Sequence, residues 1–243
     1  SFVYDNAAPT GGSFTINSNA AYTASQTGNT LNVTCPSDGW ATVQMAYGNS
    51  ASPTNWTACV STVSSYDLGT GDGTKTVYMR FKDGGDNTTS DTTDTISLDT
   101  GVPTGAPSCT ANGYFTSSQS VLCTVGTGGT VIRYTTSGID PTTASAVWSD
   151  QSFSATTTLK TISCDDANNC YTGAGVTSRT YTLDNTGPTV SAFTANNTST
   201  TQVSLDPTVS DSGSGLHATP LYYAMSAGAS CSHTSNSGWI ATD

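Results

Sequence analysis

The chain reads Asp5-Asn6-Ala7-Ala8-Pro9-Thr10 near its start, and variants of this stretch return as Asp99-Thr100-Gly101-Val102-Pro103-Thr104 and Asp184-Asn185-Thr186-Gly187-Pro188-Thr189. Each copy follows a short strand-like run. Because proline fixes φ and has no N–H, it ends strand pairing and makes a linker stiffer than a Gly/Ser linker. The copies recur at the length of one small β-sandwich, roughly 100 residues. We therefore expect separately folded sandwiches joined by semi-rigid linkers.

These linkers predict four parts of the chain: the last strand of a preceding domain over residues 1–5, a sandwich over 6–99, a second over 100–184 and an incomplete third over 185–243. The chain starts inside a strand-like run without Met or a signal peptide, so we expect a piece of a longer, processed protein. Half a sandwich has an open edge and an uncovered core face, so we expect the intact chain or a neighbour to supply the missing strands.

The composition favours strands. The chain has 17 acidic residues against six Lys and Arg, for a net charge of −11, and every acid is Asp. Since Glu favours helices whereas Asp favours turns and caps, this bias argues against helices. The acidity argues against nucleic acid and anionic membranes as partners and is compatible with divalent cations. No apolar run is long enough to span a membrane.

Strand patterns support this interpretation. Val77, Met79 and Phe81 alternate with more polar residues, as expected of a strand with one buried face. The stretch Thr74-Lys75-Thr76-Val77-Tyr78-Met79-Arg80-Phe81-Lys82-Asp83 resembles the immunoglobulin-like repeats of bacterial surface proteins, and we extend this resemblance over residues 6–99 and 185–243. The predicted fold class is all-β: tandem immunoglobulin-like antiparallel β-sandwiches, end to end.

The second predicted sandwich resembles another family. It contains Arg133-Tyr134-Thr135-Thr136-Ser137-Gly138-Ile139-Asp140-Pro141-Thr142, followed by Ala155-Thr156-Thr157-Thr158-Leu159-Lys160. This pair of stretches is similar to the C-terminal module of chitobiases and β-hexosaminidases, with Ser137 where that motif has Asp. In those enzymes the module is accessory and the catalytic barrel lies elsewhere. The resemblance therefore implies a sandwich fold and no activity.

The seven cysteines in so polar a chain predict disulfides and an oxidising compartment, and their spacing does not match a zinc site. Cys35 and Cys59 are alone in the first predicted sandwich and are expected to pair. The odd cysteine, Cys231, is expected to pair beyond this piece of the chain.

In the second sandwich we align Leu159, Thr161 and Ser163 with Val77, Met79 and Phe81. Cys164 then matches outward-facing Lys82. An outward Cys164 is expected to bridge to Cys170, which leaves Cys109 with Cys123. The alternative is the usual immunoglobulin bridge between inner faces, Cys123 to Cys164.

Carboxylates are expected to gather where each linker meets the turns of the next sandwich. The first group is Asp5, Asp38, Asp83 and Asp86 with Asn87; the second is Asp72, Asp99, Asp165 and Asp166 with Asn168 and Asn169; the third is Asp184 and Asp211. Calcium binds about six to eight oxygens of this kind, so these groups are candidate calcium sites. The alternative is that Asp and Asn simply fill turns, which favour them. No other cofactor is expected.

Catalysis finds little support. Both histidines, His217 and His233, lie in the incomplete unit, and the acids are spread along the chain without a shared cleft. Trp56, Trp148 and Trp239 follow the third strand of their units. This repeated position favours core packing over a sugar-binding platform. The chain is therefore not expected to be an enzyme.

The resulting prediction is a non-catalytic structural or adhesive segment of a long extracellular bacterial surface protein, a stalk or fibre. Its expected partners are neighbouring domains or subunits of the same fibre or cell surface. One alternative is a filament subunit that completes its neighbour's sheet by strand addition. Another is an accessory region of a secreted hydrolase, with polysaccharide as a candidate ligand.

Overall fold

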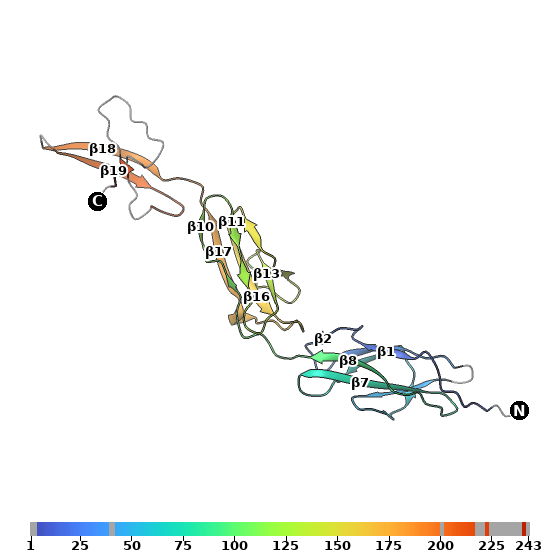
Figure 1. Cartoon of the computed structure of the whole chain (residues 1–243). Helices are drawn as coiled ribbons and strands as arrows, with labels where there is room; N and C mark the ends of the chain where they lie inside the picture. Colours follow the sequence, from blue (N-terminus) through green and yellow to red (C-terminus); the bar gives the residue numbers. More distant parts are fainter. Residues whose placement is uncertain (1–3, 39–41, 200–201, 217–221, 224–239, 242–243) are drawn as a thin grey trace. The chain divides into compact units, whose positions relative to one another are not determined.

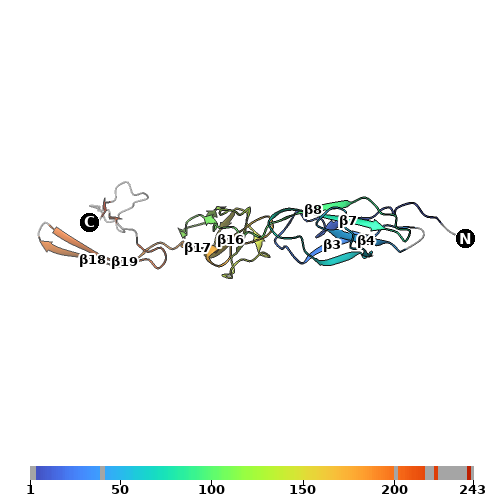
Figure 2. The same cartoon turned by 90° about the horizontal axis from the view of Figure 1, so that it is seen from below.

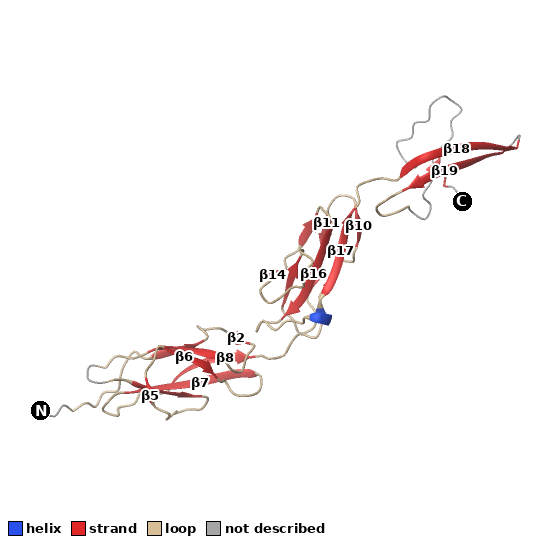
Figure 3. Cartoon of the chain, turned by 180° about the vertical axis from the view of Figure 1, so that it is seen from behind, coloured by secondary structure: helices blue, strands red, loops and turns tan. Residues whose placement is uncertain are grey.

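The computed structural model describes residues 4–38, 42–199, 202–216, 222–223 and 240–241. Over these residues the chain is almost entirely β, and the short 3-10 helix Gly173–Gly175 is the helix that Figure 3 draws among the strands. Most strand pairs are antiparallel. The expected all-β fold class is confirmed, whereas the end-to-end arrangement of the units stays a prediction.

Residues 13–98 form two sheets (Figure 1). One has the strand order β1 (Ser13–Ile16), β3 (Asn29–Thr34) and β6 (Thr62–Tyr66), and the other has the order β2 (Tyr22–Thr23), β8 (Thr92–Leu98), β7 (Gly73–Lys82), β4 (Gln44–Gly48) and β5 (Thr57–Ala58). Strands β2 and β8 pair in parallel, and the other neighbours are antiparallel. Figure 2 shows β3, β4, β7 and β8 running along this part of the chain.

The core of this sandwich comes from the inner faces of both sheets. Its buried residues are Phe14, Ile16, Leu31, Val33, Met45, Leu68, Val77, Met79, Phe81 and Ile96. On β7 the residues Val77, Met79 and Phe81 are buried, whereas the residues between them are only partly buried. The alternation predicted from the sequence is therefore confirmed. A side chain at Gly12 would lie 2.6 Å from the ring of Phe81, so only glycine fits beside it.

Residues 108–183 contain a second five-stranded sheet with the order β10 (Gly113–Phe115), β17 (Thr177–Leu183), β16 (Thr157–Cys164), β13 (Val131–Thr135) and β14 (Ala146–Val147). Two smaller pairs accompany it: β11 (Gln119–Val121) with β15 (Gln151–Phe153), and β9 (Ser108–Cys109) with β12 (Cys123–Thr124). The edge strand β10 pairs in parallel with β17, as β2 does with β8. Strand β16 is thus the counterpart of β7.

The two faces of β16 are both buried near its end. Leu159, Thr161 and Ser163 are buried on the face that corresponds to Val77, Met79 and Phe81. Cys164 was expected to face outward, but it is 0% exposed. This expectation is wrong because Cys170 and Val176 pack against Ile162 and Cys164 and cover that face.

Within the described residues three disulfides are present: Cys35–Cys59, Cys109–Cys123 and Cys164–Cys170. These are the pairings expected from the sequence, and the alternative bridge from Cys123 to Cys164 is not formed. Cys231, like His217, His233 and Trp239, lies outside the described residues.

The last described strands are the long hairpin β18 (Thr189–Ser199) and β19 (Gln202–Ser210), and the short pair β20 (Tyr222–Tyr223) and β21 (Ile240–Ala241). The chain groups into two compact units: Ser1–Thr110 with Leu122–Ser149 and Leu159–Ser178, and Ala111–Val121 with Asp150–Thr158 and Arg179–Asp243. This grouping divides the second predicted sandwich, so the boundaries at 99/100 and 184/185 stay predictions. In the described part of the chain, no helix has the length and apolar character of a membrane span.

Candidate functional site: Asp–Asn turns at the linkers

The turn that follows β7 is built around one buried carboxylate. Asp83 is 2% exposed, and its Oδ1 accepts hydrogen bonds from the backbone N–H groups of Gly85 (2.8 Å) and Asn87 (2.9 Å). Its Oδ2 accepts a bond from Asn87 Nδ2 at 2.9 Å. Asp86 completes the turn in the left-handed region, with φ of 66°, a conformation that Asp and Asn tolerate.

The same asparagine holds the first linker. Asn87 Nδ2 donates a second hydrogen bond, of 3.2 Å, to the backbone carbonyl of Asp5. An amide NH2 has two donors. One is therefore spent inside the turn and the other on the linker. The contact fixes the path of the backbone at Asp5 without depending on the linker's own side chains.

The turn that follows β16 repeats this arrangement. Asn169 donates from its backbone N–H to Asp165 Oδ1 (2.8 Å) and from Nδ2 to Asp165 Oδ2 (3.0 Å). Its Nδ2 also donates to the carbonyl of Asp99 at 2.8 Å. Asn168, with φ of 69°, takes the place of Asp86. We call each set a linker clamp: the first is Asp83 and Asn87 on the Asp5 carbonyl, and the second is Asp165 and Asn169 on the Asp99 carbonyl.

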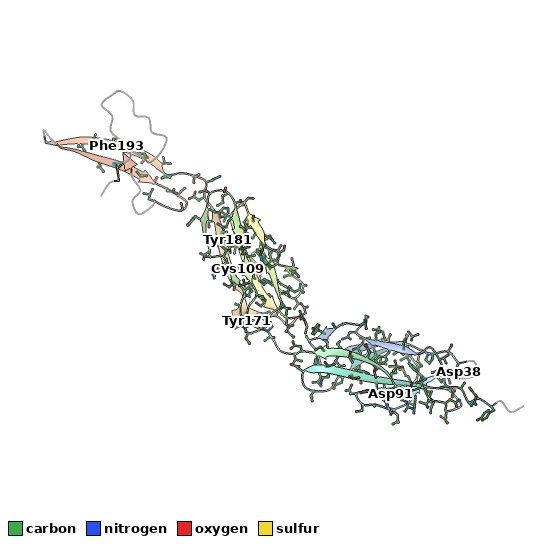
Figure 4. The ribbon with its side chains drawn as sticks, in the orientation of Figure 1. Asp38, Asp91, Cys109, Tyr171, Tyr181 and Phe193 are labelled. Atoms are coloured by element: carbon green, nitrogen blue, oxygen red, sulfur yellow. A yellow bond between two sulfur atoms is a disulfide. The ribbon has the colours of Figure 1, made fainter. Side chains whose placement is uncertain are left out.

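Three of the predicted calcium ligands come together at the first clamp. Asp5, Asp38 and Asp83 each offer a carboxylate oxygen within 4.8 Å of the other two. Asp38, labelled in Figure 4, has a buried Oδ2 without a hydrogen-bond partner. The hydrogen bond from the Asn87 side chain is the main cause that holds the pKa of Asp83 below its usual value, so this carboxylate is ionised at neutral pH. Asp86 does not belong to this group and pairs with Lys82 Nζ at 2.8 Å.

The carboxylates near the second linker are engaged by N–H and O–H donors instead. Asp72 accepts bonds from the N–H and hydroxyl of Thr100, and Asp99 accepts one from the N–H of Gly101. Asp166 accepts a bond from the Thr130 hydroxyl at 2.7 Å. Among the described residues, Asp5, Asp38 and Asp83 form the group of three with metal-ligand spacing. The predicted ligands Asp72, Asp99, Asp165 and Asp166 do not join such a group.

At the third linker the Asp side chain itself makes the contact. Asp184 is 8% exposed; its Oδ1 accepts bonds from the N–H and hydroxyl of Thr186, and its Oδ2 accepts one from the Ser214 N–H at 2.6 Å. The Ser214 N–H is the main cause that lowers the pKa of Asp184 to about 2. Asp211 shapes the turn by accepting a bond from the Gly213 N–H. A side chain at Gly213 would collide with the Asp184 carboxylate.

Sequence reasoning identified these turns but assigned Asn87 and Asn169 only as oxygen ligands. The structure shows that both act as donors to a linker carbonyl. The shared pattern Asp-x-x-x-Asn directly after a strand is the signal that was available. Trp56 and Trp148 are half-buried: Lys82 Nζ lies over the Trp56 ring, 5.0 Å from its centroid, and Trp148 packs edge-on against Tyr134.

One region of the chain matches a known protein family. Residues 110–178 match the family described as chitobiase/beta-hexosaminidase C-terminal domain. The resemblance expected for this region is confirmed. The match covers less than half of the chain and so identifies this region alone.

A solved structure titled "Biofilm associated protein - BSP domain" is similar at 19% identity with a TM-score of 0.23. The similarity covers 68% of this chain and 28% of that chain, so the matched part spans well under two thirds of that protein. A TM-score this low supports no inference about function. No curated protein matches the chain.

Proposed function

We propose that this chain is a non-catalytic structural segment of a long extracellular surface protein, a stalk or fibre whose role is mechanical. The observation that supports it best is the repeated linker clamp. Asn87 and Asn169 hold the backbones of two different linkers with the same geometry. Fixing a linker's path at the carbonyl beside the turn restricts bending at that joint, which is the property a stalk requires.

The hydrogen bonds of the buried aspartates support a non-catalytic role. Asp83, Asp165 and Asp184 are the acids buried among the described residues, and each accepts hydrogen bonds from turn or linker donors. A general acid or base needs a carboxyl that is free to exchange a proton with a substrate. The disulfides support an oxidising compartment, as expected for a surface protein.

The bending role can be tested with Asn169→Ala. Loss of the donor to the Asp99 carbonyl should widen the distribution of shapes of the whole chain in small-angle X-ray scattering. The control is Asn112→Ala, since Asn112 is exposed and lies outside the clamp. Identical scattering from Asn169→Ala and the wild type would contradict the structural role assigned to the clamp.

We further propose that the first clamp binds a divalent cation, with calcium as the best match. Two oxygens on one calcium ion lie at most about 5 Å apart, since each is about 2.4 Å from the ion. The carboxylate oxygens of Asp5, Asp38 and Asp83 satisfy this limit. An ion would offset the repulsion among three carboxylates and would give the buried Asp38 Oδ2 a partner.

Calcium titration followed by calorimetry tests this site. Calcium should bind the wild type and raise its Tm, because a ligand that binds only the folded state stabilises it by about 2.7 kcal/mol at 100 times Kd. Asp38→Asn should weaken binding at least about tenfold, since it removes one ligand charge. Asp86→Asn also removes one charge but lies outside the group, so its affinity should stay unchanged. No heat of binding and no response of Tm to a chelator would exclude the site.

A second candidate is an accessory region of a secreted hydrolase, favoured by the match of residues 110–178 to a chitobiase/beta-hexosaminidase C-terminal domain. Retention of the chain on a polysaccharide column would favour this candidate over the stalk. Passage without delay through chitin and cellulose columns would count against it.

A further inference from the structure

The two clamps differ in what closes the base of the turn. At the second clamp, Cys164 is the last residue of β16 and Cys170 follows Asn169 directly. These two cysteines face each other in an antiparallel bridge and form a disulfide. At the first clamp the equivalent positions are Lys82 and Thr88, which form the same backbone bridge without a covalent bond.

The second turn also has fewer hydrogen bonds to its buried carboxylate. Asp83 accepts bonds from both Gly85 and Asn87. The bonds described at the Asp165 carboxylate all come from Asn169. The conformation of the second turn therefore depends more strongly on where Asn169 is held.

The Cys164–Cys170 disulfide lies where it can hold Asn169 in place. Cys164 is 0% exposed and Cys170 is 9% exposed, and both pack against Ile162. Asn169 is bonded directly to Cys170, so a fixed Cys170 limits the positions that Asn169 can reach. When a bond that closes a short loop is broken, the ends of the loop regain conformational freedom.

We propose that the Cys164–Cys170 disulfide keeps the second linker clamp closed, and that its reduction frees the linker at Asp99. A dithiol is the reductant: it supplies two electrons and two protons, the S–S bond breaks into two thiols, and the dithiol closes to its own disulfide. Asn169 then loses its fixed position and releases the Asp99 carbonyl. The first clamp has no such bond and stays closed. This inference adds redox control to the proposed structural role and does not depend on the cation.

Hydrogen exchange measured by mass spectrometry on the full chain tests the proposal. All samples contain a chelator, so that the cation does not contribute. In Cys164→Ala/Cys170→Ala, amides in residues 99–104 and 165–169 should exchange at least about tenfold faster, as expected for a local opening. Residues 83–87 of the first clamp should not change. The matched control is Cys109→Ala/Cys123→Ala, which removes the β9–β12 bridge and should leave residues 99–104 unchanged.

If the double variant fails to fold, the wild type treated with dithiothreitol provides a second measurement, and residues 99–104 and 165–169 should again exchange faster. Because dithiothreitol also reduces Cys35–Cys59 and Cys109–Cys123, only these two segments are compared. Unchanged exchange in residues 99–104 after loss of the disulfide overturns the proposal. Asn169→Ala distinguishes the linker clamp itself from its control by the disulfide. If Asn169→Ala loosens the linker but loss of the disulfide does not, the clamp stands and its redox control is wrong. If neither loosens it, the clamp itself does not hold the linker.

Discussion

Strands β7 and β16 occupy the same place in sheets of the same order, yet they bury different chemistry. On β7 the inward residues are Val77, Met79 and Phe81. On β16 they are Leu159, Thr161 and Ser163, all at most 1% exposed. Strand β7 thus buries three large apolar side chains on this face, whereas β16 buries one, Leu159, together with two small hydroxyl-bearing ones.

The buried hydroxyl groups of β16 lie in a segment with more hydrogen-bond and covalent support than β7 has. The Ser163 hydroxyl accepts a hydrogen bond from the Gly126 N–H at 2.9 Å, so the buried hydroxyl oxygen has a hydrogen-bond partner. Two disulfides lie in this segment, Cys109–Cys123 and Cys164–Cys170, against one in residues 6–99. The comparison teaches that the strand order can be kept while apolar burial is partly exchanged for hydrogen bonds and covalent bonds.

The largest predicted effect is in the apolar core. Phe81→Ala should lower the free energy of unfolding of residues 13–98 by about 3–5 kcal/mol, the usual cost of deleting a buried Phe side chain. Ser163→Ala should cost only about 1 kcal/mol in its own sheet, because it loses one hydrogen bond. Hydrogen exchange of β7 and β16 amides measures both. Equal costs would contradict the claimed difference between the two cores.

An intermediate effect is expected from the disulfides. Cys35 and Cys59 are separated by 24 residues, and Cys164 and Cys170 by six. By loop entropy alone, removing the first bond with alanines should cost about 3 kcal/mol and removing the second about 2 kcal/mol. Denaturant unfolding, monitored by hydrogen exchange of individual segments, shows which disulfide costs more stability when it is removed. A larger cost for Cys164–Cys170 would indicate that it does more than close a short loop, which would sharpen its proposed role at the clamp.

The smallest effect concerns pH and extends the comparison to the third linker. Hydrogen bonds, first from the Ser214 N–H, lower the pKa of folded Asp184 to about 2. Since the unfolded value is about 3.9, this carboxylate stabilises the fold above that pH, and the contribution disappears as pH falls through about 2. NMR titration of the Asp184 carboxyl should give a midpoint near 2. A midpoint near the unfolded value would show that Asp184 does not hold the turn after Asp211.

Several features were predictable because they depend on local sequence. Strand alternation identified β7, since a residue's face follows from its parity along a strand. Alignment of β16 with β7 led to the pairing of Cys164 with Cys170. The reason given for that pairing was wrong: Cys164 is buried, because packing by Val176 from a later segment cannot be inferred from alternation on one strand.

The candidate site was also predictable only in part. Asp and Asn at the turns were evident from composition, and the approach of Asp5 to Asp83 was expected from immunoglobulin-like topology. The separation of Asp86 from Asp83 was not expected. The Asp86 carboxylate is largely exposed and pairs with Lys82 Nζ instead. Whether a polar side chain donates, accepts or binds an ion depends on atoms brought from distant parts of the chain.

By itself the sequence determined the class of structure: Asp in place of Glu, period-two alternation and recurring Asp-to-Pro linkers leave strands and tight turns as the stable choice. Only the tertiary structure decided which of these acids meet and what they do. Asn87 and Asn169 lie four residues after their aspartates, but their linker partners are 82 and 70 residues away along the chain. Hydrogen bonds act over about 3 Å, so folding alone selects those partners.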